Sequence, residues 1–312
     1  MIQIFSLEMI SFAVALVGSS IAAAFDLKTT EIPDKVPYTM IAAALIIYGV
    51  KSVIEWNYLP ILNSVAVGIL LFGFGFVMYY LGQWGGGDAK LLSAIGFLLP
   101  GSNVLSSIFP STILWFPFPV SYLFNVFFVG AVYMLVYAFV LTLINKNIIR
   151  EFKHDIKAST NTIILSSVAL FVALLFLNWS FAKAFQSSNI QSPTVFNIRA
   201  YFVNNAPTLL VNSLVPLVLT IGLFLVWKFV RAVENVAFKK RIHVTKLKVG
   251  DVLMKSKLWE GLTIKEIRQI KKSGKKYVWI KEGVRFAPAF PLALVFTVYF
   301  GDAILLLFRI LG

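Results

Sequence analysis

The chain has 312 residues, of which 59% are hydrophobic and only 13% charged, with a net charge of +14 and a mean hydropathy of +0.83. A soluble domain carries about 25% charged residues, so the composition excludes an ordinary soluble fold and predicts an all-α polytopic membrane protein. The absence of cysteine excludes disulfides, thiolate metal sites, iron–sulfur clusters and cysteine nucleophiles.

The two histidines, His154 and His243, both lie in charged segments rather than in apolar runs. A His-Glu-x-x-His metalloprotease is therefore excluded, and a membrane serine protease would lack its base. Carboxylates remain as the plausible catalytic groups, and neither a metal nor a cofactor is expected. Residues 1–7 carry no Lys or Arg, so we expect the first apolar run to be a permanent span rather than a removed signal peptide.

The apolar runs predict between six and eight membrane-spanning helices, because a span needs about 20 apolar residues. The eight candidates lie near residues 8–25, 36–54, 60–82, 89–108, 119–144, 160–181, 207–229 and 287–308. Residues 228–285 hold 17 Lys and Arg against 5 Asp and Glu. By the positive-inside rule, the segments 26–35, 83–88, 145–158 and 230–285 are then expected in the cytoplasm and both chain ends outside.

The basic segment after the seventh expected span has the pattern of a small α+β domain. Thr263-Ile-Lys-Glu266 fits a capping box at the start of a helix, and residues 277–280 have the composition of a strand. The domain's positive charge is expected to attract anionic membrane lipid. No sequence motif in it indicates nucleic-acid binding. The expected division is catalytic helices in 1–100, further helices in 101–229, this domain in 230–285 and a final helix in 286–312.

Two aspartates stand at the ends of apolar runs. Asp26 closes the first run, and Asp88 follows Gly85-Gly86-Gly87 and precedes the fourth. Because two expected spans separate them, both aspartates should lie at the same membrane face. Asp88 could simply cap a helix. Asp26 has no such explanation, since a carboxylate is unfavourable at a helix C-terminus. An ionisable residue at a membrane helix is a functional candidate, and we predict a catalytic pair.

Two segments resemble the paired signature of the type IV prepilin peptidases, a Gly-x-Gly-Asp family of aspartyl membrane proteases. These are residues 26–34 (DLKTTEIPD) and 85–92 (GGGDAKLL). The resemblance covers roughly residues 10–100, and similarity to the archaeal preflagellin and prepilin peptidases resumes between residue 247 and the last span. Residues 105–228 match nothing in this pattern.

The resemblance implies that Asp26 and Asp88 are catalytic and that Gly85, Gly87 and Lys90 are supporting motif positions. It implies that the substrates are archaeal type IV pilin-like or archaellin precursors, cut after a short basic leader at the cytoplasmic membrane face. Bacterial members commonly carry a tetracysteine zinc module and methylate the new N-terminus. Because this chain has no cysteine, we expect peptidase activity without methylation.

Three alternatives stay open at this point. A presenilin-like or signal-peptide-peptidase-like protease would need its first aspartate inside a span, whereas Asp26 is followed at once by Leu27-Lys28-Thr29-Thr30-Glu31. A proton- or cation-coupled transporter would use Asp26, Asp88 and Asp302, but such sites normally lie near the bilayer midplane. A non-catalytic scaffold would make the pairing of the aspartates a coincidence.

The segment Ala287-Pro-Ala-Phe-Pro291 also resembles the Pro-Ala-Leu motif near the dyad of presenilin-type proteases. The tolerance of proline in the first turn of a helix also explains it, and we favour this interpretation. A structural role beside the aspartate pair is the other interpretation.

Overall fold

The computed structural model of the protein describes residues 2–101, 114–187, 206–256 and 261–306. Six of the described helices are long and apolar enough to cross a membrane, which agrees with the predicted multi-pass membrane protein. The chain divides into two compact units. One comprises residues 1–139 and 238–312, and the other comprises residues 140–237.

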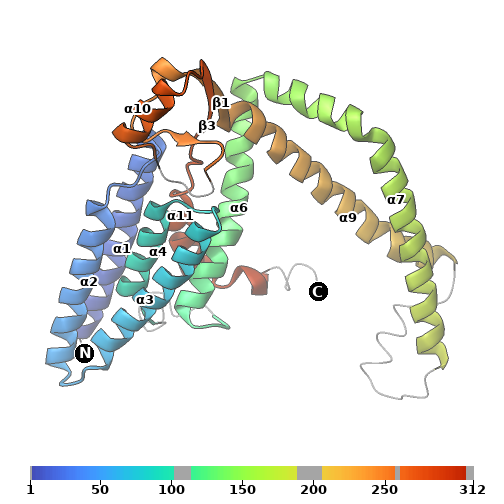
Figure 1. Ribbon diagram of the computed structural model, residues 1–312. Helices are drawn as coiled ribbons and strands as arrows, with labels where there is room; N and C mark the ends of the chain where they lie inside the picture. Colours follow the sequence, from blue (N-terminus) through green and yellow to red (C-terminus); the bar gives the residue numbers. More distant parts are fainter. Residues whose placement is uncertain (1, 102–113, 188–205, 257–260, 307–312) are drawn as a thin grey trace. The chain divides into compact units, whose positions relative to one another are not determined.

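Four helices form the first part of the larger unit and lie side by side in Figure 1. They are α1 (Ile2–Thr29), α2 (Lys35–Ile54), α3 (Leu59–Tyr80) and α4 (Gly86–Leu98). The first three are candidate spans. At a rise of 1.5 Å per residue, α4 is only about 20 Å long, which is shorter than the hydrocarbon core.

The early end of α4 is explained by side chains that satisfy its last carbonyl groups. Ser11 and Tyr48 donate to the Leu98 carbonyl at 2.5 and 2.8 Å, and Ser64 donates to the Phe97 carbonyl at 2.6 Å. Carbonyl groups at a helix end must find partners where water is excluded. The helix expected over 89–108 therefore stops at Leu98, and residues 102–113 lie outside the described residues.

Helices α3 and α4 approach each other closely where glycine removes a side chain. A Cβ atom built on Gly75 would lie 2.8 Å from Ala89 Cα, and one on Gly96 would lie 3.2 Å from the Val67 carbonyl oxygen. Small residues allow membrane helices to pack backbone against backbone. This packing fixes the first turn of α4, which carries Asp88, against α3.

Two further helices complete the bundle of the larger unit, namely α6 (Phe118–Ile144) and α11 (Ala289–Phe300). The span expected over 287–308 is interrupted after Phe300, where Gly301 adopts a φ of 73°. Asn125 bridges the interruption: it donates to Thr297 and to the Gly301 carbonyl and accepts from Ala303 N.

A small α+β domain at the end of the bundle consists of β1 (Lys239–His243), β2 (Val252–Leu253), α10 (Ile264–Lys272) and β3 (Tyr277–Lys281). The strands are antiparallel in the order β1-β3-β2. Thr263 and Glu266 form the predicted capping box, in which Thr263 N donates to the Glu266 carboxylate at 2.8 Å. In Figure 1 this domain lies where α1 ends and α4 begins.

The second unit contains α7 (Asn147–Ser187) and α9 (Ala206–Val233). Asn178 bonds Ser213 at 2.9 Å, and Lys228 forms an ion pair with Asp155 at 3.0 Å, so the two helices run antiparallel. Helix α7 already begins at Asn147, so most of the segment 145–158, which was expected between two spans, is helical. The charged turns of this segment continue directly into the apolar part of one helix.

Candidate active site

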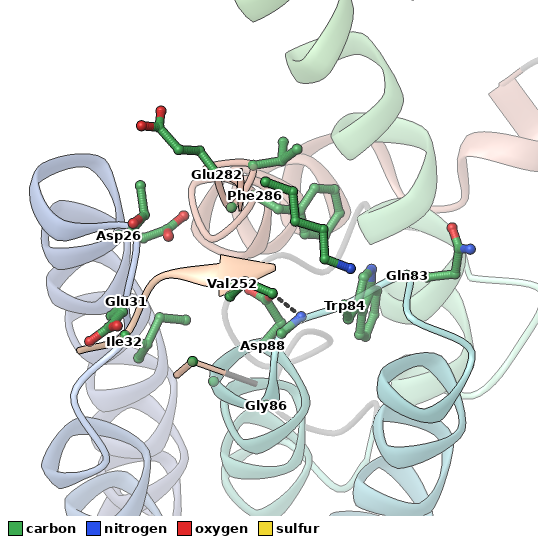
Figure 2. Close-up of a pocket in the computed structure, with 18 of the residues that line it drawn as sticks. Asp26, Glu31, Ile32, Gln83, Trp84, Gly86, Asp88, Val252, Glu282 and Phe286 are labelled. Atoms are coloured by element: carbon green, nitrogen blue, oxygen red, sulfur yellow. Dashed lines mark hydrogen bonds between the residues drawn. The ribbon is translucent and has the colours of Figure 1, made fainter. Parts of the chain in front are cut away.

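A cavity of about 730 Å³ lies at the end of the bundle next to the α+β domain. Figure 2 shows that its lining comes from the end of α1, the start of α4, α6 and the α+β domain. Asp26, Asp88, Gly85 and Gly87 all line this cavity. The prediction from span counting, that both aspartates lie at one end of the bundle, agrees with this arrangement.

Asp26 lies within α1, one turn before the helix ends. Helix α1 continues to Thr29, and Thr30 then adopts a left-handed φ of 59°. The predicted end of the span near residue 25 is therefore about one turn too early, because the helix continues through Leu27 and the polar residues Lys28 and Thr29. The candidate span Leu7–Thr29 includes Asp26, so the argument that Asp26 lies outside a span no longer separates a prepilin-type from a presenilin-type protease.

The Asp26 carboxylate is held by the C-terminal part of the chain. Only 5% of the Asp26 residue surface is exposed, and Ala287 donates its backbone N–H to Asp26 Oδ2 at 2.9 Å. Ala287 is itself fully buried and precedes Pro288, the N-cap residue of α11. The proline-rich segment 287–291 thus begins a helix and also lies beside the aspartate, so both interpretations of it hold.

Asp88 lies in the first turn of α4 rather than ahead of the helix. Gly85 is the N-cap residue, and its N–H donates to Asp88 Oδ2 at 3.1 Å (dashed in Figure 2). Asp88 is outside the six candidate spans. Burial, followed by the negative charge of Asp26, raises the pKa of Asp88 to about 7, and the Gly85 N–H opposes this rise. Asp88 can therefore hold or release a proton near neutral pH.

The motif residues Gly87 and Lys90, which lie near Asp88, contact the segment that follows Asp26. A Cβ atom on Gly87 would lie 2.9 Å from Ile32 Cβ, so only glycine fits there without movement. Lys90 does not line the cavity; its Nζ pairs with Asp34 Oδ1 at 2.6 Å and lies 5.7 Å from the centre of the Tyr38 ring. Of the predicted site residues, Asp26, Asp88, Gly85 and Gly87 come together and Lys90 lies behind them.

Sequence analysis did not identify the aromatic wall of the cavity. Trp84 is 6% exposed, stacks on Phe127 with ring centres 5.6 Å apart, and also packs against Phe286 at 5.8 Å. All three aromatic residues line the cavity, and Figure 2 labels Trp84 and Phe286. The position of Trp84 directly before Gly85 was the available signal for Trp84. Phe127 comes from α6 and Phe286 from the segment that precedes α11, both far from Trp84 along the chain.

The cavity is acidic although the protein is basic. Its described lining includes one lysine, Lys281, and five acids: Asp26, Glu31, Asp88, Asp251 and Glu282. Asp251 and Glu282 belong to the α+β domain, whose overall charge is positive. Burial lowers the pKa of Lys281, which makes its positive charge less costly to lose. The cavity therefore favours cationic groups.

The described residues contain no group of three or more His, Cys, Asp or Glu side chains that could hold a metal ion. The arrangement instead offers two carboxyl groups in one cavity, of which Asp88 has a pKa suited to proton exchange. Such a pair can activate a water molecule and polarise a carbonyl group.

Comparison with known proteins agrees with this chemistry. Residues 13–144 match the type IV leader peptidase family. The match extends well past residue 100, where the motif resemblance ended, and it stops where the second compact unit begins. Unit 140–237 is therefore almost entirely outside the matched region.

Three archaeal proteins are among those similar to this chain. A preflagellin peptidase of Methanocaldococcus jannaschii is 41% identical over 96 residues, which cover 31% of this chain and 41% of that protein. A preflagellin peptidase of Methanococcus voltae is 34% identical over 134 residues, covering 41% and 54%. The prepilin peptidase EppA of Methanothermobacter thermautotrophicus is 24% identical over 169 residues, covering 52% and 44%.

The matched regions thus span about half the length of these relatives or less. They nevertheless agree with the family recognised from the two aspartate motifs. Over residues 13–144, the part that carries Asp26, Asp88 and the glycines between them, this chain is similar to the type IV leader peptidases.

Proposed function

We propose that this protein is a membrane-embedded aspartyl endopeptidase that removes the short basic leader from archaeal type IV pilin-like or archaellin precursors, without methylating the new N-terminus. The observation that carries the proposal is that Asp26 and Asp88, from two separate motif segments, line one cavity. The family match over residues 13–144 and the names of the archaeal relatives support the substrate class.

In the proposed mechanism the two carboxyl groups share one proton. Asp88, with a pKa of about 7, is the better proton carrier at neutral pH. It donates a hydrogen bond to the carbonyl oxygen of the scissile peptide. Ionised Asp26, oriented by the Ala287 N–H, removes a proton from the attacking water. The proton that Asp26 took from the water then passes to the nitrogen of the leaving amine as the peptide C–N bond breaks. Asp26 is again ionised and Asp88 again protonated.

The acids of the cavity support a basic leader as the bound segment. Glu31 and Asp251 line the cavity without belonging to the proposed catalytic pair. A Lys- or Arg-containing leader would be attracted to them, and the α+β domain would contribute to substrate binding through these local carboxylates despite its basic surface. The net positive charge of the domain would attract anionic lipid headgroups.

The basic segments 146–157 and 228–285 support a cytoplasmic location of the cavity through the positive-inside rule. A precursor whose leader lies in the cytoplasm and whose hydrophobic helix lies in the membrane would then present its leader boundary at this depth. A presenilin-like protease remains the second candidate, because Asp26 is inside a helix and is bonded by the segment that contains Pro288-Ala289.

The test is incubation of membranes containing this protein with a panel of archaeal pilin-like and archaellin precursors, followed by sequencing and mass analysis of the product N-terminus. A single cut at the leader boundary, with an unmodified amino group, is the expected result. Cleavage only inside the hydrophobic helix would favour the presenilin-like candidate. No cleavage of any precursor by correctly inserted protein would contradict both.

A further inference from the structure

An aspartate stands at the start of α2 but does not cap that helix with its side chain. Asp34 occupies the N-cap position of α2, yet its side chain makes no capping hydrogen bond. Aspartate is among the preferred residues at this position because its carboxylate accepts a free N–H of the first turn. In this protein the Asp34 carboxylate accepts instead from Lys90 Nζ at 2.6 Å. The Asp34 side chain thus forms a bond to α4 in place of a capping bond within α2.

This connection joins the two segments that carry the proposed catalytic aspartates. Asp34 ends the segment that follows Asp26, and Lys90 stands two residues after Asp88. A second contact joins the same segments, because Gly87 packs against Ile32 so tightly that a Cβ atom would lie 2.9 Å from Ile32 Cβ. The pairs Ile32–Gly87 and Asp34–Lys90 are therefore two neighbouring contacts between the segment that leads into α2 and the first turns of α4.

Lys90 has two partners at the start of α2. Its Nζ pairs with Asp34 and also lies 5.7 Å from the centre of the Tyr38 ring, one turn further along α2. A cation at this distance from an aromatic face is attracted to it. Lys90 thus contacts two residues of the first turns of α2, and α2 follows directly from the segment that begins at Asp26.

We propose that the Asp34–Lys90 ion pair is an interlock that holds the Asp26 segment against the first turn of α4 and so sets the separation of the two catalytic carboxyl groups. Asp34 and Lys90 are positioning residues, since neither lines the cavity. Their side chains remain 59% and 30% exposed. Because exposed ion pairs contribute little to folding stability, loss of this pair should leave the protein folded.

The activity test rests on the proposed peptidase function. Lys90→Met removes the charge and keeps most of the length of the side chain, Lys90→Arg keeps the charge, and Asp34→Asn removes the charge of the other partner. Lys35→Met is the matched control, since it removes an equal charge beside Asp34 at a lysine that has no ion pair within the described residues. Lys90→Met and Asp34→Asn should lower kcat by about tenfold to a hundredfold with little change in KM, as misplacement of catalytic groups does. Lys90→Arg and Lys35→Met should stay near the unmodified protein.

A second readout does not depend on any activity. The chain has no cysteine, so Ile32→Cys with Gly87→Cys creates the only two thiols, at positions whose Cβ atoms are close enough for a disulfide after a small shift. Mild oxidation followed by thiol labelling measures how often the segments meet. The interlock predicts slower disulfide formation when Lys90→Met is added, and no change with Lys35→Met.

The two readouts separate the interlock from the proposed function. If no variant, including the unmodified protein, cleaves any precursor, the peptidase proposal fails while the disulfide rates still test the interlock. Unchanged disulfide rates in Lys90→Met would overturn the interlock, whatever the activity. Slower disulfide formation with full cleavage activity would overturn its catalytic role, and so would an equal loss of activity in Lys35→Met.

Discussion

Ala287 donates its backbone N–H to the carboxylate of Asp26 at 2.9 Å, although 261 positions separate the two residues. The donor is a backbone group of the turn that starts α11, so the orientation of Asp26 depends on the C-terminal part of the chain. This bond connects the family-matched region, residues 13–144, to a segment outside it. The candidate site is therefore complete only when both parts of the larger unit are present.

The pH dependence of cleavage should follow the proton on Asp88. Its pKa is raised to about 7 by burial and by the charge of Asp26. A raised carboxyl pKa means that the proton is held below this value and lost above it, so the protonated member of the pair disappears as pH rises. We expect kcat/KM to fall about tenfold per pH unit above this pKa. Rates measured from roughly pH 6 to pH 9 that stay constant or increase would contradict the assignment of the proton to Asp88.

Adjacent glycines in the motif should respond very differently to alanine. A Cβ atom on Gly87 would lie 2.9 Å from Ile32 Cβ, whereas one on Gly86 would approach nothing closer than Tyr79 at 3.9 Å. Gly87→Ala should lower kcat by at least about tenfold because it pushes the two motif segments apart, and Gly86→Ala should be nearly neutral. Adding Ile32→Ala to Gly87→Ala should restore most of the activity. Equal effects of the two glycine changes would argue against close packing as the reason for Gly87.

The affinity for a precursor with a basic leader should depend on the acidic residues of the cavity. Glu31 is exposed and lines the cavity, so Glu31→Gln removes a charge without disturbing a buried contact. We expect KM for a precursor with a basic leader to rise by about threefold to tenfold at low salt, and the difference to shrink as salt screens the interaction. A precursor whose leader lysines are replaced by glutamine should not distinguish the variants.

The control for this experiment is Glu55→Gln, which removes an equal charge from a residue that lines a different cavity. Loss of affinity in this control, or the same KM increase for the neutral leader, would show that the effect is not local recognition.

The aromatic wall should be needed for a stable site. Trp84 is nearly buried between Phe74, Phe127, Phe286 and Phe290. Trp84→Ala should destabilise the protein by about 3–5 kcal/mol through the cavity that it leaves, and Trp84→Phe by less. Thermal unfolding in detergent measures the difference. Equal unfolding temperatures for Trp84→Ala and the unmodified protein would contradict the packing described for this wall.

The sequence was most informative where local patterns repeat a simple geometry. Counting two spans between Asp26 and Asp88 correctly predicted that they lie at one end of the bundle, because each crossing reverses the direction of the chain. The capping box at Thr263 and the strand at residues 277–281 also follow from local hydrogen bonding and alternation.

Hydropathy did not predict where helices stop inside the bundle. Helix α4 ends at Leu98, directly before Leu99-Pro100, which is a local signal that hydropathy does not register. Side chains from three other helices satisfy its last carbonyl groups, and such long-range bonds leave no mark on an apolar run. The same reason applies to the break at Gly301, which Asn125 bridges. In the opposite sense, α1 extends through Lys28 to Thr29, since a helix end can leave the apolar layer and remain helical.

Contacts between distant segments were beyond sequence reasoning. Ala287 at Asp26, Phe127 and Phe286 at Trp84, and Asp34 at Lys90 each require the folded arrangement. The role of the α+β domain was obscured by its overall positive charge. Two of its few acids, Asp251 and Glu282, line the cavity, and only the fold distinguishes them from the basic surface.

The most direct test of the central claim is cleavage of a pilin-like or archaellin precursor by the unmodified protein beside Asp26→Asn and Asp88→Asn, each checked for membrane insertion and thermal stability. Asparagine keeps the size of each side chain and removes its ability to exchange a proton. The proposed pair predicts a single cut at the leader boundary by the unmodified protein and loss of that cut in both variants, with insertion unchanged. Full cleavage by either well-inserted variant would contradict a catalytic pair formed by Asp26 and Asp88.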